Sequence, residues 1–390
     1  MSAATPTPAA AGRQIAGQVA NRWGAPVGLA LIWIAMALVN PRFLSPVNLT
    51  NLVLQIVAVG TIAIGVVLVL LIGEIDLSVG AVSGFGAAVV AVASTRYGLA
   101  APVAIVAGLG VGGLAGALHG LLVTRVGIPS LVVTLAGLLT WQGTLLFVLG
   151  DTGTVNVTDP ALIAIAGSFV TPTVGWLLVA GTAVATATIS ASRWRRGARD
   201  LRAHLPWLAI TGASAAAMSV FNQDRGLPTA ALLFLGLVAG FDVIVRRTRF
   251  GRHAVAVGSN AIAARRAGIP VARVRVTAFV LAAVLAACGG ILAASRLLAV
   301  NQSSGSTDLM LGAIAAAVIG GTSLFGGRGS VWSALLGALV VGSVANGLDL
   351  LGVSSAARSL TTGVVLALAV GLDTVARRNS NASGAGLAPP

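Results

Sequence analysis

Two carboxylates placed two positions apart, Glu74 and Asp76, are the residues of this sequence whose type and spacing most directly suggest chemistry. They belong to the motif G-E-I-D-L-S-V-G at residues 73–80, which also holds Ser78, and the long stretches on either side contain no charge. A charge among lipid-length apolar segments is costly unless it is paired or faces a polar route. The motif is therefore the first candidate for a functional site.

Starting a helix is a second possible role for the same motif. We expect a helix from near Leu77, and an acid just before it can accept backbone N–H bonds and complement the helix dipole. For Asp76 we favour this capping role, and for Glu74 we favour contact with a polar path or a partner.

Several kinds of chemistry are excluded by residues that the sequence lacks. All 24 cations are arginine, so there is no lysine for a Walker A loop or a Schiff base. The three histidines, His119, His204 and His253, are scattered, and no Ser/His/Asp set or cysteine cluster is present. We expect no catalytic residue, no metal site and no enzyme.

The composition defines the elements that must position the motif. The chain of 390 residues is 57% hydrophobic and 9% charged, and apolar stretches near the roughly 20 residues needed to cross a bilayer recur along it. Period-two alternation, which a transmembrane β-strand requires, is absent. The sequence predicts an all-α, polytopic transmembrane helix bundle with about 10–12 spans, some of them broken helices.

The apolar stretches predict twelve spans, the first of them uncleaved, between two polar tails. The expected parts are a cytoplasmic N-terminal tail (1–22), a membrane domain (23–378) and a disordered C-terminal tail (379–390). The predicted spans are 25–40, 51–72, 77–95, 99–123, 130–150, 173–191, 205–221, 228–245, 276–298, 309–324, 331–348 and 355–375.

Arginine counting orients the bundle. Nineteen of the 24 arginines fall on one side of the predicted membrane, which the positive-inside rule makes cytoplasmic. Both termini are then cytoplasmic. Because the net charge of +14 is confined to short loops between spans, we do not expect nucleic-acid binding.

One predicted span carries a row of glycines four residues apart, from Gly108 to Gly120. Small residues on one helix face allow close helix packing in lipid. His119 lies beside this row, and we interpret it as a hydrogen-bonded packing residue.

The basic segment 246–275 is the second candidate site. Ser259 or Asn260 can cap a short helix over residues 261–267, which Gly268 and Pro270 would end. Such a helix, with Arg265 and Arg266 projecting from it, suits docking to a soluble partner. It suits equally well a position on anionic lipid headgroups.

Five stretches together resemble the permease subunits of the ribose/xylose/arabinose/galactose family of ATP-binding-cassette importers. They are G-E-I-D-L-S-V-G from Gly73, I-P-S-L-V-V-T-L-A-G from Ile128, R-T-R-F-G-R-H-A-V-A-V-G-S-N from Arg247, A-A-R-R-A-G-I from Ala263, and A-I-A-A-A-V-I-G-G-T-S-L-F-G-G-R-G-S from Ala313. The chain is most similar to the xylose subgroup. It shares that subgroup's extra pair of spans around 194–221, the segment N-Q-D-R-G-L-P-T from Asn222, and an acid at Glu74.

Three residues depart from the family pattern. Ile262 stands where the coupling segment usually has glutamate, His119 where asparagine is common, and Arg328 in a turn that is usually smaller. The resemblance implies that the remaining coupling residues contact the ATPase: Asn260, Ala263, Ala264, Arg265, Arg266 and Gly268.

The resemblance also implies the partners and the location of the chain. Two permease copies would work in a bacterial inner membrane with an ATPase that has duplicated nucleotide-binding domains and an extracytoplasmic sugar-binding protein. ATP and Mg would bind to the ATPase, and this chain would bind no cofactor. We hypothesise that Glu74, Asp76 and Ser78 lie at or beside the translocation path of a monosaccharide, for which we expect D-xylose.

There are three alternatives to the import of D-xylose by an ATP-binding-cassette importer. The first is another substrate for the same importer: ribose, arabinose, galactose or a nucleoside. The second is an ion-coupled secondary transporter, which the scarcity of carboxylates within the spans disfavours. The third, a membrane scaffold that does not transport, leaves the acidic motif unexplained.

Overall fold

The computed structural model describes residues 26–195 and 204–354. Beyond these it describes residues 356–357, 359–361, 363–364, 367 and 371. The predicted tails, 1–22 and 379–390, and most of the predicted span 355–375 lie outside the described residues.

Apolar helices make up the described chain. The first is the helix Pro26–Val39, and a short helical turn, η1 (Pro41–Leu44), leads into the next. The others are α2 (Pro46–Leu71), α3 (Val79–Thr95), α4 (Ala101–Leu121) with its extension η2 (Leu122–Val126), α5 (Ser130–Leu149), α6 (Pro160–Gly167), α7 (Pro172–Arg195), α8 (Leu205–Phe221), α9 (Thr229–Arg247), α10 (Arg249–Ser259), α11 (Ala261–Arg266), α12 (Val271–Leu297), α13 (Thr307–Ile319) and α14 (Trp332–Leu350). Seven helices among the described residues are long and apolar enough to cross a membrane. The predicted all-α polytopic bundle is confirmed.

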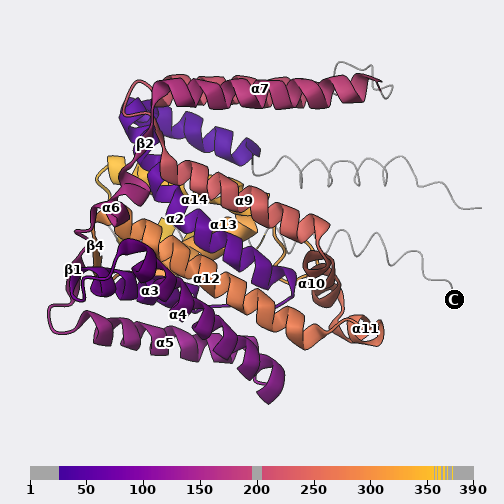
Figure 1. The fold of residues 1–390 in the computed structure, drawn as a ribbon. Helices are drawn as coiled ribbons and strands as arrows, with labels where there is room; N and C mark the ends of the chain where they lie inside the picture. Colours follow the sequence, from indigo (N-terminus) through magenta and orange to yellow (C-terminus); the bar gives the residue numbers. More distant parts are fainter. Residues whose placement is uncertain are drawn as a thin grey trace, which may run out of the picture.

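Two small antiparallel ribbons lie at one end of the bundle. Strand β1 (Thr154–Asn156) pairs with β4 (Ala299–Asn301), and β2 (Phe169–Val170) pairs with β3 (Leu227–Pro228). Helices α10 and α11 lie at the opposite end (Figure 1). We call that end, with the start of α12, the arginine-rich end.

Helices α2 and α12 form the centre of the bundle. Of the 18 consecutive residues that make up the most apolar stretch of α2, 83% are buried inside the bundle. The corresponding share for α7 is 11%. Helix α7 runs along one edge of the bundle in Figure 1. It packs against α8 through polar contacts such as the 2.8 Å hydrogen bond between the Thr186 and Thr211 hydroxyls. The α7–α8 pair is thus a peripheral hairpin.

Three glycines of the α4 row, Gly112, Gly116 and Gly120, face α12, whereas Gly108 faces α3, so the predicted close packing is confirmed against two helices. A methyl group at Gly112 would lie 2.8 Å from the backbone oxygen of Ala283, and one at Gly116 would overlap the backbone oxygen of Phe279. These positions let the two backbones touch without intervening side chains.

Several predicted boundaries were wrong, and α10 was missed. The predicted span 309–324 ends at Ile319, because Gly321 then takes a left-handed conformation (φ +105°) that stops the helix. The segment 246–275 holds two helices instead of one. Helix α10 begins where the Thr248 side chain accepts a hydrogen bond from the Gly251 amide. Helices α3 and α13 have 17 and 13 residues, shorter than a full crossing, in line with the predicted broken helices.

Candidate functional site

The acidic motif forms the connection between α2 and α3 at the arginine-rich end. Helix α2 ends at Leu71, and Gly73 takes a left-handed conformation (φ +77°) that turns the chain. The Gly327 amide donates to the Leu71 carbonyl at 3.1 Å. A methyl group at Gly258, in the last turn of α10, would overlap that same carbonyl. Three backbone segments therefore meet at the end of α2.

Asp76 organises the start of α3 from within the bundle. Its Oδ1 accepts hydrogen bonds from the backbone N–H of Ser78 at 2.8 Å and from the Ser78 hydroxyl at 2.6 Å. The helix begins at Val79, two residues later than expected, so Asp76 braces the residue that precedes the helix and does not cap its first turn. Asp76 is 4% exposed and its Oδ2 has no hydrogen-bond partner.

A chain of buried polar side chains continues from Ser78 into α4 and α5. The Ser78 Oγ lies 3.4 Å from Nδ1 of His119, and the indole N–H of Trp141 donates to Nε2 of His119 at 3.0 Å. Because Nε2 accepts, the neutral imidazole carries its proton on Nδ1 and donates it to Ser78, whose own proton goes to Asp76. Every donor in this chain thus points towards the carboxylate of Asp76.

Two neighbours give this chain its space and rigidity. A methyl group at Gly137 on α5 would overlap Nε2 of His119. The Trp141 ring stacks on Phe85 of α3, with ring centroids 5.6 Å apart and planes within 9°. The larger histidine at position 119 is therefore matched by a glycine and an indole donor on α5.

Glu74 points away from this buried chain and pairs with α12. Its Oε1 lies 2.9 Å from Nη2 of Arg275, and the two side chains are 12% and 27% exposed. Arg275 lies one turn into α12, and only residues 267–270 separate that helix from the end of α11 at Arg266. The ion pair thus ties the acidic motif to the helix that follows the predicted coupling segment.

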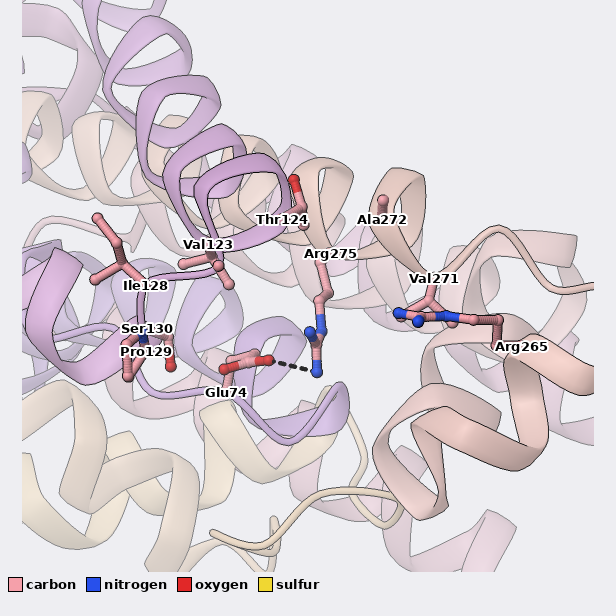
Figure 2. A pocket seen from close by; sticks show the side chains of 11 residues that line it. Glu74, Val123, Thr124, Ile128, Pro129, Ser130, Arg265, Val271, Ala272 and Arg275 are labelled. Carbon is pink, nitrogen blue, oxygen red and sulfur yellow. Dashed lines mark ion pairs between the residues drawn. The ribbon is translucent and has the colours of Figure 1, made fainter.

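An open cavity of about 320 Å³ lies beside this ion pair. Figure 2 shows Glu74 and Arg275 joined across it, with Arg265 of α11 extending towards them. Glu74 comes from the predicted path and Arg265 from the predicted coupling segment. The two candidate sites, far apart in the sequence, therefore meet in one cavity.

The residues predicted to couple to an ATPase lie in and beside the short helix α11 at the arginine-rich end. The side-chain oxygen of Asn260 accepts a hydrogen bond from the Ala263 amide at 2.9 Å and so caps α11. Asn260 is thus the cap, of the two candidates Ser259 and Asn260. Gly268 ends the helix with φ +81°. Ala264 is buried, while Ala263, Arg265 and Arg266 are exposed.

The sequence grouped Glu74, Asp76 and Ser78, but the structure divides them between two settings. Asp76 and Ser78 are buried in the bundle, and Glu74 lines the open cavity. Sequence reasoning missed Arg275, Trp141 and Gly137 as members of these settings. No local sequence pattern distinguishes these three residues. Arginines near the ends of spans and tryptophans within apolar stretches are ordinary in this chain, and Gly137 is one of 50 glycines.

A bundle of helices long and apolar enough to cross a membrane, with polar groups held inside it and a basic end, defines a polytopic membrane protein. Residues 48–370 match the family described as "Branched-chain amino acid transport system / permease component". The chain belongs to this family of transport permeases.

Relatives with known names cover most of both chains. The sequence is 36% identical over 346 residues to the xylose transport system permease protein XylH of Escherichia coli, covering 87% of each chain. It is 32% identical to the ribose import permease protein RbsC of Bacillus subtilis, covering 91% of this chain and 93% of the relative. It is 30% identical to the L-arabinose ABC transporter permease protein AraH of Azospirillum brasilense, covering 94% and 91%. No solved structure matches the chain.

Proposed function

We propose that this chain is the membrane-spanning subunit of an ATP-binding-cassette importer that carries D-xylose into a bacterial cytoplasm. The observation that carries the proposal is the 36% identity to XylH over 87% of both chains. The peripheral α7–α8 hairpin supports it further, because that pair of helices corresponds to the extra spans by which the sequence resembles the xylose subgroup.

The proposed orientation places the arginine-rich end in the cytoplasm. Arg246, Arg247, Arg265, Arg266 and Arg273 are all exposed at this end, as the positive-inside rule favours. The ribbons β1–β4 and β2–β3 then face the outside, where a sugar-binding protein would deliver substrate. By the same rule both termini are cytoplasmic.

The ATPase partner would contact α10 and α11. Exposed Arg265 and Arg266 project from α11, which its Asn260 cap holds in shape. ATP and Mg would bind to duplicated nucleotide domains on that partner, and two copies of this chain would form the membrane path. Replacing both arginines by glutamine should reduce co-purification with the ATPase; unchanged co-purification and uptake would remove them from the docking surface.

The path hypothesis applies to Glu74 more directly than to Asp76 and Ser78. Glu74 lines an open cavity, whereas the other two contribute by shaping the start of α3. If Glu74→Gln and Asp76→Asn both leave uptake unchanged at normal protein levels, the path hypothesis fails for these residues.

Uptake of labelled sugar tests the substrate. The chain should be expressed with its ATPase and binding protein in cells that lack their own xylose import. We expect D-xylose uptake that unlabelled xylose abolishes and that ribose, arabinose or galactose reduces less. Uptake that survives inactivation of the ATPase but collapses with the ion gradient would instead indicate a secondary transporter.

A further inference from the structure

The cavity beside Glu74 carries a net positive charge. Two guanidinium groups, those of Arg265 and Arg275, line it against the single carboxylate of Glu74, which leaves one positive charge uncompensated. Among the described residues no acidic side chain lies within ion-pair distance of Arg265. An excess of positive charge around a cavity favours the binding of an anion there.

Arg275 has capacity beyond its bond to Glu74. The pair uses Nη2 of Arg275, and its Nε is buried without any hydrogen-bond partner. Since guanidinium offers five donors in a fixed fork and the Arg275 side chain is 27% exposed, a second acceptor can approach its terminal nitrogens. Figure 2 shows that the Arg265 side chain extends towards Arg275, and both line the same cavity.

The N-terminal ends of two helices add hydrogen-bond donors that carry partial positive charge. Helix α5 begins at Ser130 and α12 at Val271, both of which line the cavity. The residues that precede them, Pro129 and Pro270, provide no capping side chain. The first backbone N–H groups of both helices thus add to the positive potential set by the arginines.

The lining also contains apolar side chains, which an anion in water would not require. Val123, Ile128 and Val271 line the cavity together with the hydroxyls of Thr124 and Ser130. Most of the lining comes from the ends of membrane-crossing helices α4, α5 and α12, and Arg265 is the contribution of α11. A mixed lining at helix ends suits a group that joins a charged head to an apolar tail.

We propose that this cavity binds a phosphate group carried by an anionic phospholipid of the cytoplasmic leaflet, held between Arg265 and Arg275. The proposal rests on the cytoplasmic orientation given under the proposed function. Basic pockets between helices on that side are where anionic headgroups bind, and the leaflet concentrates them. The bound phosphate would hold α11 against α12 and share Arg275 with Glu74.

Binding to the purified full-length chain tests this without sugar transport. The protein in neutral detergent is titrated with phosphatidylglycerol, with phosphatidylcholine or with inorganic phosphate, and its thermal unfolding midpoint is followed. Phosphatidylglycerol should raise the midpoint and phosphatidylcholine should not. Arg265→Gln should raise about fivefold the phosphatidylglycerol concentration that gives half of this effect, the worth of one arginine near an anionic surface, and Arg265→Lys should change it less.

Arg273→Gln is the matched control, because Arg273 is an exposed arginine of α12 outside the cavity lining. It should respond to phosphatidylglycerol as the unaltered protein does. Equal responses of Arg265→Gln and Arg273→Gln overturn the proposal, as does protection by inorganic phosphate equal to that by the lipid. If Arg265→Gln loses the ATPase while its lipid response is unchanged, the cavity serves an acidic group of that partner instead. A failed sugar assay with an intact lipid response would overturn only the proposed function.

Discussion

Asp76 and Glu74 are two residues apart in one motif, yet they have opposite surroundings. Asp76 is 4% exposed and receives its hydrogen bonds from Ser78, and the polar chain behind Ser78 continues into α4 and α5. Glu74 lies at an open cavity and has one charged partner on α12. A turn between two membrane helices can thus contain both a fixed internal brace and an accessible ion pair.

The comparison predicts that the brace matters for stability and the ion pair for transport. Polar groups left unpaired inside a bundle cost more than an exposed ion pair contributes.

Asp76→Ala should have the largest effect. It leaves the buried N–H and hydroxyl of Ser78 without their acceptor, at a cost of about 3 kcal/mol. Asp76→Asn, which keeps one oxygen in place, should cost less than half as much. Thermal unfolding of the detergent-solubilised variants measures both, and equal losses would show that the charge, not the acceptor, is what the site requires.

Gly137→Ala should come next, because its methyl group overlaps the His119 ring. Overpacking of this kind costs about 2 kcal/mol. Gly143→Ala on the same helix is the control, since a methyl group there meets nothing within 4 Å. Combining Gly137→Ala with His119→Ala should recover part of the loss; a simple sum of the two single losses would contradict the contact.

Trp141→Phe should cost at least about 1 kcal/mol, the net worth of one hydrogen bond. The smaller ring can still stack on Phe85, and the change removes the bond to Nε2 of His119 together with part of the packed indole. Unfolding midpoints give the loss. A loss as large as that of Asp76→Ala would mean that the stacking, too, depends on the indole N–H.

Glu74→Gln should have the smallest effect on stability, under about 1 kcal/mol, because both partners are partly exposed to solvent. It should nevertheless reduce uptake several-fold if the ion pair must form and break during the transport cycle. Uptake assays and unfolding midpoints on the same preparation separate these effects. Large destabilisation with normal uptake per folded molecule would reverse the comparison.

The helices were predictable from the sequence because membrane burial demands long apolar stretches, which are visible without any contact information. Helix α10 was missed because Arg249, Arg252 and His253 make it too polar to resemble a span. Its start depends on the Thr248 cap, which only the structure shows.

The site was half predictable. Glu74 and Asp76 stand out because charge is rare among apolar runs, but their partners do not. Arg275 is one of many arginines near span ends, and no local pattern tells which of them an acid will meet. The pairing of His119 with Gly137 and Trp141 likewise depends on how α4 and α5 pack.

The meeting of Leu71, Gly258 and Gly327 has a mechanical consequence. These contacts join backbone to backbone. A movement of α10 relative to the end of α2 therefore cannot be absorbed by the rotation of a side chain between them. If the ATPase pushes on α10, the displacement reaches the central helix of the bundle in full. Stiffness at this contact, more than charge, would then set how efficiently ATP hydrolysis is converted into movement.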